Sequence, residues 1–203
     1  LICYNVPTGA VDMTISGGTA PFGIAWTGPS GFTSPSEDIS GLNEGYYSVS
    51  VTDSKGCTAT ASITLTQPPV LNASLAGASV TCFGANDGSI TISGATGGTG
   101  SFEYSVNGGT SWAGTGTFTG LAPGTYNVRM RDAVNPGCIL VLNPALVITQ
   151  PAQLAATVAN TDVTCFGANN GTITITNPTG GYGSYQYSID GGTTWVGSGI
   201  FTG

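Results

Sequence analysis

Residues 39–57 read ISGLNEGYYSVSVTDSKGC, and residues 118–138 repeat the same plan as FTGLAPGTYNVRMRDAVNPGC. In both stretches a Leu-x-x-Gly-x-Tyr motif leads into a segment where apolar and polar residues alternate. Alternation with a period of two is typical of a β-strand that buries one face. We therefore predict two strands whose buried faces begin at Tyr47 and Tyr126. The other face would carry serine and threonine in the first strand, and Arg129 and Arg131 in the second.

The tyrosine of this motif looks like the tyrosine corner of Greek-key sandwiches, in which the hydroxyl bonds back to the backbone at the start of a late strand. Short alternating runs such as SITIS (89–93) and TITIT (172–176) occur along the chain, and no long segment shows a helical period. The sequence therefore predicts an all-β protein built from β-sandwich modules, with Tyr47 and Tyr126 in structural roles.

Internal repeats set the organisation. The stretch SVTCFGANDGSITI (79–92) returns 83 residues later as DVTCFGANNGTITI, and an earlier, more divergent copy precedes both. The pairs Gln67-Pro68 and Gln150-Pro151 mark the ends of copies, because proline cannot continue a paired central strand. We predict three modules of about 80 residues each: 1–67 without its first strand, 68–150 complete, and 151–203 without its C-terminal strands. These segments are copies one, two and three below.

The composition excludes several classes of function. The chain has 3 Lys and Arg against 10 Asp and Glu, no histidine and a net charge of −7. Nucleic-acid binding needs clustered basic residues, which this chain lacks. No run of about 18 apolar residues is present, so this segment is not expected to insert into a membrane. Without histidine no Ser-His-Asp set can form, and no acidic pair recurs between copies, so we predict no enzyme.

Five cysteines recur at matched places. Cys3 and Cys57 lie 54 residues apart in copy one, and Cys82 and Cys138 lie 56 apart in copy two. In small β modules this pattern predicts the disulfides Cys3–Cys57 and Cys82–Cys138, each stabilising its module by ~4 kcal/mol. Cys165 would pair with a cysteine beyond residue 203. The alternative is five buried free thiols, whereas zinc is disfavoured because there is no histidine and no close cysteine pair.

Residues 188–195, SIDGGTTW, fit the Asp-box pattern found on sialidase propellers. A sialidase needs a cluster of arginines, and here the box recurs once per copy, so we interpret the stretch as a structural hairpin. Asp190 and Gly192 supply the turn chemistry, since Asp accepts local hydrogen bonds and Gly tolerates positive φ. Trp112 and Trp195 would shield the turns, or alternatively stack on a sugar ring as a glycan contact.

A calcium site is a further hypothesis. Asp53, Asp132 and Asp162 follow or precede predicted strands near module ends, where a calcium ion could bridge two modules. The NDG stretch at 86–88 resembles the start of a calcium loop but lacks the other ligands, so a turn is favoured there. No other cofactor is expected.

Several motifs in one order strongly resemble the SprB repeat: CFGANDGSITI (82–92), the Leu-x-x-Gly-x-Tyr corner, VTDSKGC (51–57) and ITQP (148–151). The resemblance covers nearly the whole chain. That module is strung in long arrays along very large secreted proteins of the Bacteroidota, including a gliding-motility adhesin. The resemblance implies an immunoglobulin-like β-sandwich, export by type IX secretion and display at the cell surface, and it implies no active site.

The sequence therefore favours a stalk segment of an extracellular adhesin, whose partner is a surface polysaccharide or the substratum and whose use includes gliding motility. Two alternatives stay open. The chain could be a structural filament or sheath subunit that binds copies of itself, or the carbohydrate-binding region of a larger secreted protein.

Overall fold

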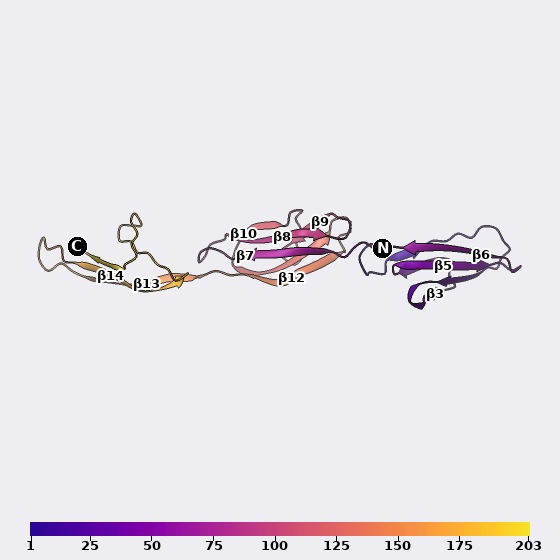
Figure 1. Cartoon of the computed structure of the whole chain (residues 1–203), viewed down its shortest axis with the longest axis horizontal. Helices are drawn as coiled ribbons and strands as arrows, with labels where there is room; N and C mark the ends of the chain where they lie inside the picture. The colour runs from indigo at the N-terminus through magenta and orange to yellow at the C-terminus, as the bar shows by residue number, and fades with distance from the viewer. The chain divides into compact units, whose positions relative to one another are not determined.

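The computed structural model describes all 203 residues and confirms the all-β prediction (Figure 1). A 3-10 turn at Pro29–Gly31 is its one helical element, and no helix is long and apolar enough to cross a membrane. The strands are β1 (Gly9–Val11), β2 (Gly23–Thr27), β3 (Thr33–Ser34), β4 (Ile39–Leu42), β5 (Gly45–Thr52), β6 (Thr58–Leu65), β7 (Asn72–Ala78), β8 (Gly88–Thr96), β9 (Phe102–Ser105), β10 (Thr117–Leu121), β11 (Gly124–Asp132), β12 (Ile139–Ile148), β13 (Ala152–Thr161), β14 (Thr172–Gly181) and β15 (Ile200–Thr202).

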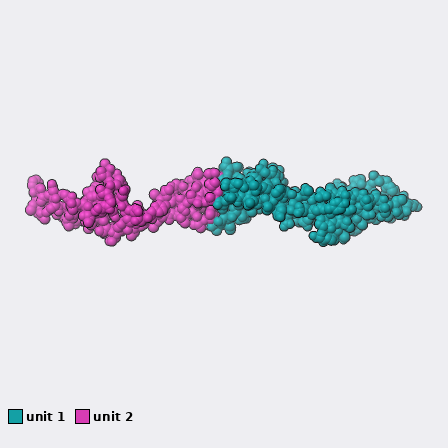
Figure 2. Space-filling view, in the orientation of Figure 1, with its two compact units in different colours: residues 1–75, 92–116, 127–145 teal, residues 76–91, 117–126, 146–203 magenta.

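The chain forms two compact units (Figure 2). Unit 1 contains residues 1–75, 92–116 and 127–145, and unit 2 contains residues 76–91, 117–126 and 146–203. Unit 1 holds copy one and one part of copy two, and unit 2 holds the other part of copy two and copy three. The division runs through copy two, so the three module boundaries stay a prediction.

Copy one is a small sandwich of two antiparallel sheets, β1-β4 and β3-β2-β5-β6. Side chains from both sheets meet in one buried cluster, which consists of Trp26 from β2, Ile39 and Leu42 from β4, and Tyr47 and Val49 from β5. Burial of each large apolar side chain contributes about 1.5–3 kcal/mol. The cluster forms because the alternation in β5 places Tyr47 and Val49 on the same face of the sheet.

Copy two has two three-stranded antiparallel sheets, β10-β8-β7 and β12-β11-β9. Alternate residues are buried in each, as the sequence pattern predicts: Ile90 and Ile92 in β8, and Val128 and Met130 in β11. The register pairs Phe118 of β10 with Ile90. Several small antiparallel sheets with one buried face are the arrangement expected of β-sandwich modules.

Copy three has one sheet, β13-β14-β15, and β13 is exposed at every residue. Its residues can be compared with their equivalents 83 positions earlier. Ile173 is 36% exposed where Ile90 is fully buried, and Val163 is 55% exposed where Val80 is 1% exposed. The same strand sequences therefore stay exposed where no second sheet covers them.

Both tyrosines of the Leu-x-x-Gly-x-Tyr motif bond back to the backbone four residues earlier. The Tyr47 hydroxyl donates to the carbonyl oxygen of Asn43 at 3.2 Å, and the Tyr126 hydroxyl donates to that of Ala122 at 2.8 Å. Each bond closes the corner that leads into β5 or β11, which is the geometry that a tyrosine corner requires.

Candidate functional site

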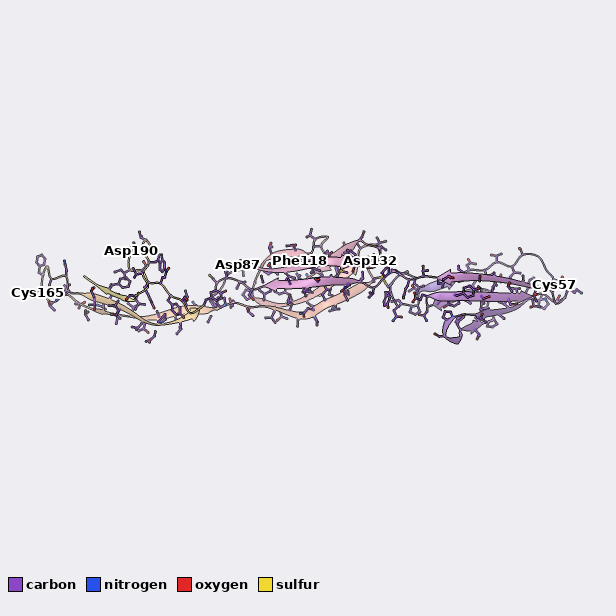
Figure 3. The ribbon with its side chains drawn as sticks, in the orientation of Figure 1. Cys57, Asp87, Phe118, Asp132, Cys165 and Asp190 are labelled. Carbon is purple, nitrogen blue, oxygen red and sulfur yellow. A yellow bond between two sulfur atoms is a disulfide. The ribbon has the colours of Figure 1, made fainter.

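The disulfide predicted from spacing is wrong in its pairing. The structure joins Cys3 of copy one to Cys138 of copy two, across 135 residues of sequence and with Cα atoms 5.4 Å apart. Cys57, Cys82 and Cys165 are free and exposed, so neither Cys3–Cys57 nor Cys82–Cys138 forms. Cys57 and Cys165 are marked in Figure 3.

Strand length explains why the predicted pairs cannot form. Cys57 lies directly before β6, whereas Cys3 lies near Gln67 beyond the other end of that strand, since the Asn5 N–H donates to the Gln67 side chain. The eight residues of β6 span about 25 Å at a rise of about 3.3 Å per residue. A disulfide needs Cα atoms within about 7 Å. In copy two, the ten residues of β12 separate Cys138 from the Gln150 end in the same way.

Copies one and two meet at a junction that lies within unit 1. The Pro68-Pro69 linker, the loop around Cys3 and the segment Gly137–Leu140 line one hollow of about 240 Å³. The opening cysteine of copy one therefore faces the closing cysteine of copy two. The side-chain oxygen of Gln67 accepts a 2.6 Å hydrogen bond from the N–H of Asn5, so this glutamine holds the opening loop against the linker.

An opening loop, closed by one side chain, precedes the first strand of every copy. In copy two the carboxylate of Asp87 accepts bonds from the N–H and hydroxyl of Thr81, and these bonds lower the pKa of Asp87, the hydroxyl most. Asn170 bonds to Thr164 in copy three, and Thr8 accepts from the N–H of Ile2 in copy one. Three different side chains thus close the same loop around Cys3, Cys82 and Cys165.

A closing loop follows β5 and β11, and an aspartate organises each one. The Asp53 carboxylate accepts bonds from the N–H groups of Thr19, Lys55 and Cys57, and the Cys57 N–H does most to lower the pKa of Asp53. Asp132 (Figure 3) is buried, which raises its pKa, but bonds from Thr99 and Asn135 outweigh burial and lower the pKa. Each aspartate therefore presents its closing cysteine on a rigid loop.

The calcium hypothesis must be set beside this use of the carboxylates. Asp53 and Asp132 already accept several hydrogen bonds each, and Asp162 accepts one from the side chain of Asn160. The structure gathers no group of three acidic or cysteine side chains. A calcium ion would therefore have to replace existing N–H donors, and the site stays an untested prediction.

The hairpin of copy three is organised by Asp190 (Figure 3). Its carboxylate accepts the hydroxyl and N–H of Thr194 and the hydroxyl of Ser188, and these bonds hold its pKa well below the usual value. Gly192 has a φ of 89°, and an added Cβ would lie 3.4 Å from the Trp195 ring. Copy two builds the same turn with Asn107, which accepts from the hydroxyl of Ser105 and the N–H of Ser111.

The two tryptophans differ in their surroundings. Trp112 is half-buried, and the guanidinium carbon of Arg131 lies 4.3 Å from its ring centroid. Trp195 is 58% exposed, and its indole N–H donates to the Gly192 carbonyl at 2.9 Å. Trp195 thus leaves ring surface open to a ligand, whereas the Trp112 ring is covered by a cation.

Sequence reasoning missed the ion pair beside Trp112. Arg131 and Arg129 were expected on a solvated face, but both are half-buried, and an Arg131 nitrogen lies 2.6 Å from a Glu103 oxygen. The register of β11 with β9 places Arg131 opposite Glu103. A strand-pairing register was the missing signal, since 28 residues separate the two in sequence.

Comparison with known proteins agrees with the repeat pattern. No curated protein matches the chain. A family model described as the SprB repeat matches residues 1–31, 78–111 and 157–194, one segment in each copy and together just over half of the chain. The opening loops with Cys3 and Cys82, and the hairpin of Asp190, lie within these matches. The chain therefore belongs to the SprB repeat family.

Proposed function

We propose that the chain is a non-catalytic stalk segment of a large secreted cell-surface adhesin, in which consecutive repeats are joined into a string that carries pulling force. The observation that supports this most is the covalent link between copy one and copy two through Cys3 and Cys138. A bond at the junction prevents the two joined ends from separating under load, whatever happens inside either copy.

The surroundings of the junction add to this proposal. Gln67 bonds to the opening loop beside the disulfide, and the linker it precedes is only Pro68-Pro69-Val70 before the chain reaches Leu71 and β7. Proline fixes its own φ and limits the bending of so short a connection. A stalk that projects a distal element from a cell needs such restricted junctions.

The surface suits weak contacts repeated many times. Only 6% of residues are charged, and the exposed strand faces of β6 and β13 are rich in threonine, serine and alanine. Many weak sites on one string can bind far more tightly than any one alone. The proposed partner is therefore a surface polysaccharide or the substratum. Export by type IX secretion and a use in gliding motility belong to the same proposal.

Electron microscopy of the native, unreduced, full-length protein released from cells tests the stalk. Thin single strings of beads support it, whereas a polymer with a regular lattice contradicts it and favours the filament. Adhesion is tested separately by deleting the repeats from the full-length protein. The deleted strain should detach under lower shear while still displaying the remaining protein, and unchanged attachment at equal display contradicts the adhesive role.

Glycan contact at Trp195 is a second candidate, which the exposure of its ring favours. Stacking on an exposed aromatic ring is a common way to hold a sugar. A glycan array probed with the chain should show binding that Trp195→Ala removes and Trp112→Ala keeps, because Arg131 covers Trp112. Binding that survives Trp195→Ala contradicts this candidate.

A further inference from the structure

The junction between copies two and three repeats the junction between copies one and two. The N–H of Gly84 donates to the side-chain oxygen of Gln150 at 3.0 Å, just as that of Asn5 donates to Gln67. Each bonding N–H lies two residues after an opening cysteine, which is Cys82 in copy two and Cys3 in copy one.

The backbone path at the two junctions also matches. A side chain on Gly97 would overlap the carbonyl oxygen of Val70, and one on Gly180 would overlap that of Gln153. Gly180 and Gln153 lie 83 residues after Gly97 and Val70. In both copies the turn after the long strand is therefore packed directly against the strand that follows the linker.

What differs is the segment that faces the opening cysteine. At the first junction Gly137–Leu140 completes the lining of a 240 Å³ hollow, and Cys138 within that segment is bonded to Cys3. At the second, Cys82, Leu154 and Gly181 line a hollow of about 490 Å³ in the same positions as Cys3, Leu71 and Gly98. No closing segment lines it, because the residues that would match 121–150 lie after Gly203.

The uncovered side chains at the second hollow are those that a closing segment would touch. Leu154 is 66% exposed, whereas the equivalent Leu71 is half-buried, and Tyr182 beside it is 77% exposed. Cys82 is exposed and carries a free thiol. A reactive group, an apolar wall and a hollow are thus arranged as at the first junction, where a disulfide is formed.

We propose that the opening cysteine of each repeat forms a disulfide with the closing cysteine of the next repeat, and that Cys82 is therefore half of a bond to the closing cysteine of copy three. By the same rule Cys165 bonds to the closing cysteine of a fourth repeat, and Cys57 bonds to the opening cysteine of a repeat that precedes copy one. Each junction of the array then carries one disulfide, and no disulfide lies within a repeat.

The chemistry is thiol–disulfide exchange with a small-molecule disulfide such as oxidised glutathione. One thiolate attacks the glutathione disulfide and releases one glutathione thiol, and the second protein thiolate then displaces the other. The two protein thiols are oxidised to one S–S bond, and one glutathione disulfide is reduced to two glutathione thiols. An oxidising compartment outside the cytosol supplies such conditions.

This inference does not rest on what the array binds, so it can fail or hold separately from the adhesive function. The test is the full chain extended after Gly203 by a second copy of residues 121–150, which places a cysteine 83 positions after Cys138. The extended chain is refolded with reduced and oxidised glutathione, free thiols are alkylated, and disulfide-linked peptides are identified by mass spectrometry.

The expected result is two linked pairs, Cys3 with Cys138 and Cys82 with the appended cysteine, and alkylation of Cys57 and Cys165. In a Cys82→Ser variant the appended cysteine should be alkylated rather than joined to Cys165. Hydrogen exchange at Ile173 reports folding of the completed copy, since its amide should slow at least tenfold once a second sheet covers β14. A bond between Cys165 and the appended cysteine, or a free Cys82 in a protected copy, overturns the proposal.

The native full-length protein gives a second measurement that does not depend on folding of the extension. Its unreduced peptide map should show linked cysteines separated by about the 135 residues that separate Cys3 from Cys138. Links across 54–56 residues, the spacing within one copy, overturn the proposal.

Discussion

Removal of the Cys3–Cys138 bond should destabilise the chain far more than removal of any other cysteine. The bond closes a loop of 135 residues, and the chain-entropy estimate for a loop of that length is ~5 kcal/mol at 25 °C. The loop runs through the core of copy one and through β11, so the stabilisation applies to the unfolding of both copies together. The Cys3→Ser/Cys138→Ser double variant avoids leaving a reactive free thiol at the junction.

Urea denaturation under oxidising conditions, followed by the fluorescence of Trp26 and Trp112, measures the effect. With a denaturant dependence of about 2 kcal/mol per molar urea, the double variant should unfold at a midpoint lower by about 2 M. Trp26 is buried in copy one, and Trp112 lies against Arg131 in copy two, so each copy carries its own probe.

Cys57→Ser is the matched control. Cys57 is exposed and free, so its replacement should change the free energy of unfolding by less than about 0.5 kcal/mol. The within-copy pairing predicts the opposite, because a 54-residue loop would be worth ~4 kcal/mol. A large effect of Cys57→Ser, or no effect of the double variant, refutes the junction bond.

Three further predictions follow from local geometry. Tyr126→Phe should cost ~1 kcal/mol, because it removes the hydrogen bond to Ala122; an unchanged urea midpoint would discard the corner. Asp190→Asn should keep the hairpin, since Asn107 builds the same turn in copy two, whereas Asp190→Ala should raise amide exchange at Thr194; equal exchange in both variants contradicts this account. Acid should destabilise the fold: Asp53, Asp87, Asp132 and Asp190 have folded pKa values below their ordinary 3.8, so their contribution is complete above about pH 4 and is lost as pH falls further. Thermal melts between pH 7 and pH 2 that show no loss would contradict it.

The features that could be predicted from the sequence are those set by neighbouring residues. The alternation after Tyr47 predicted the strand, its buried face and the corner bond, because each depends on residues within one strand and one turn. The hairpin of Asp190 was predictable for the same reason, since all of its bonds lie between Ser188 and Trp195.

Features set by the ends of strands and by register could not be predicted in this way. The spacing of Cys3 and Cys57 says nothing of where each lies along the sandwich, and it was β6 that placed them at opposite ends. The stretch TATASITL (58–65), which separates Cys57 from Gln67, carried a usable signal, because a strand of that length keeps its two ends apart. The Arg131–Glu103 pair needed the register of β11 with β9, which no local pattern supplies.

The most direct test of a covalently joined array is the disulfide map of the 203-residue chain itself, folded with oxidised glutathione and digested without reduction. The structure predicts one linked pair of peptides, containing Cys3 and Cys138, and three alkylated cysteines at positions 57, 82 and 165. Linked peptides that join Cys3 to Cys57 and Cys82 to Cys138 would contradict the account and return the disulfides to the interior of each repeat.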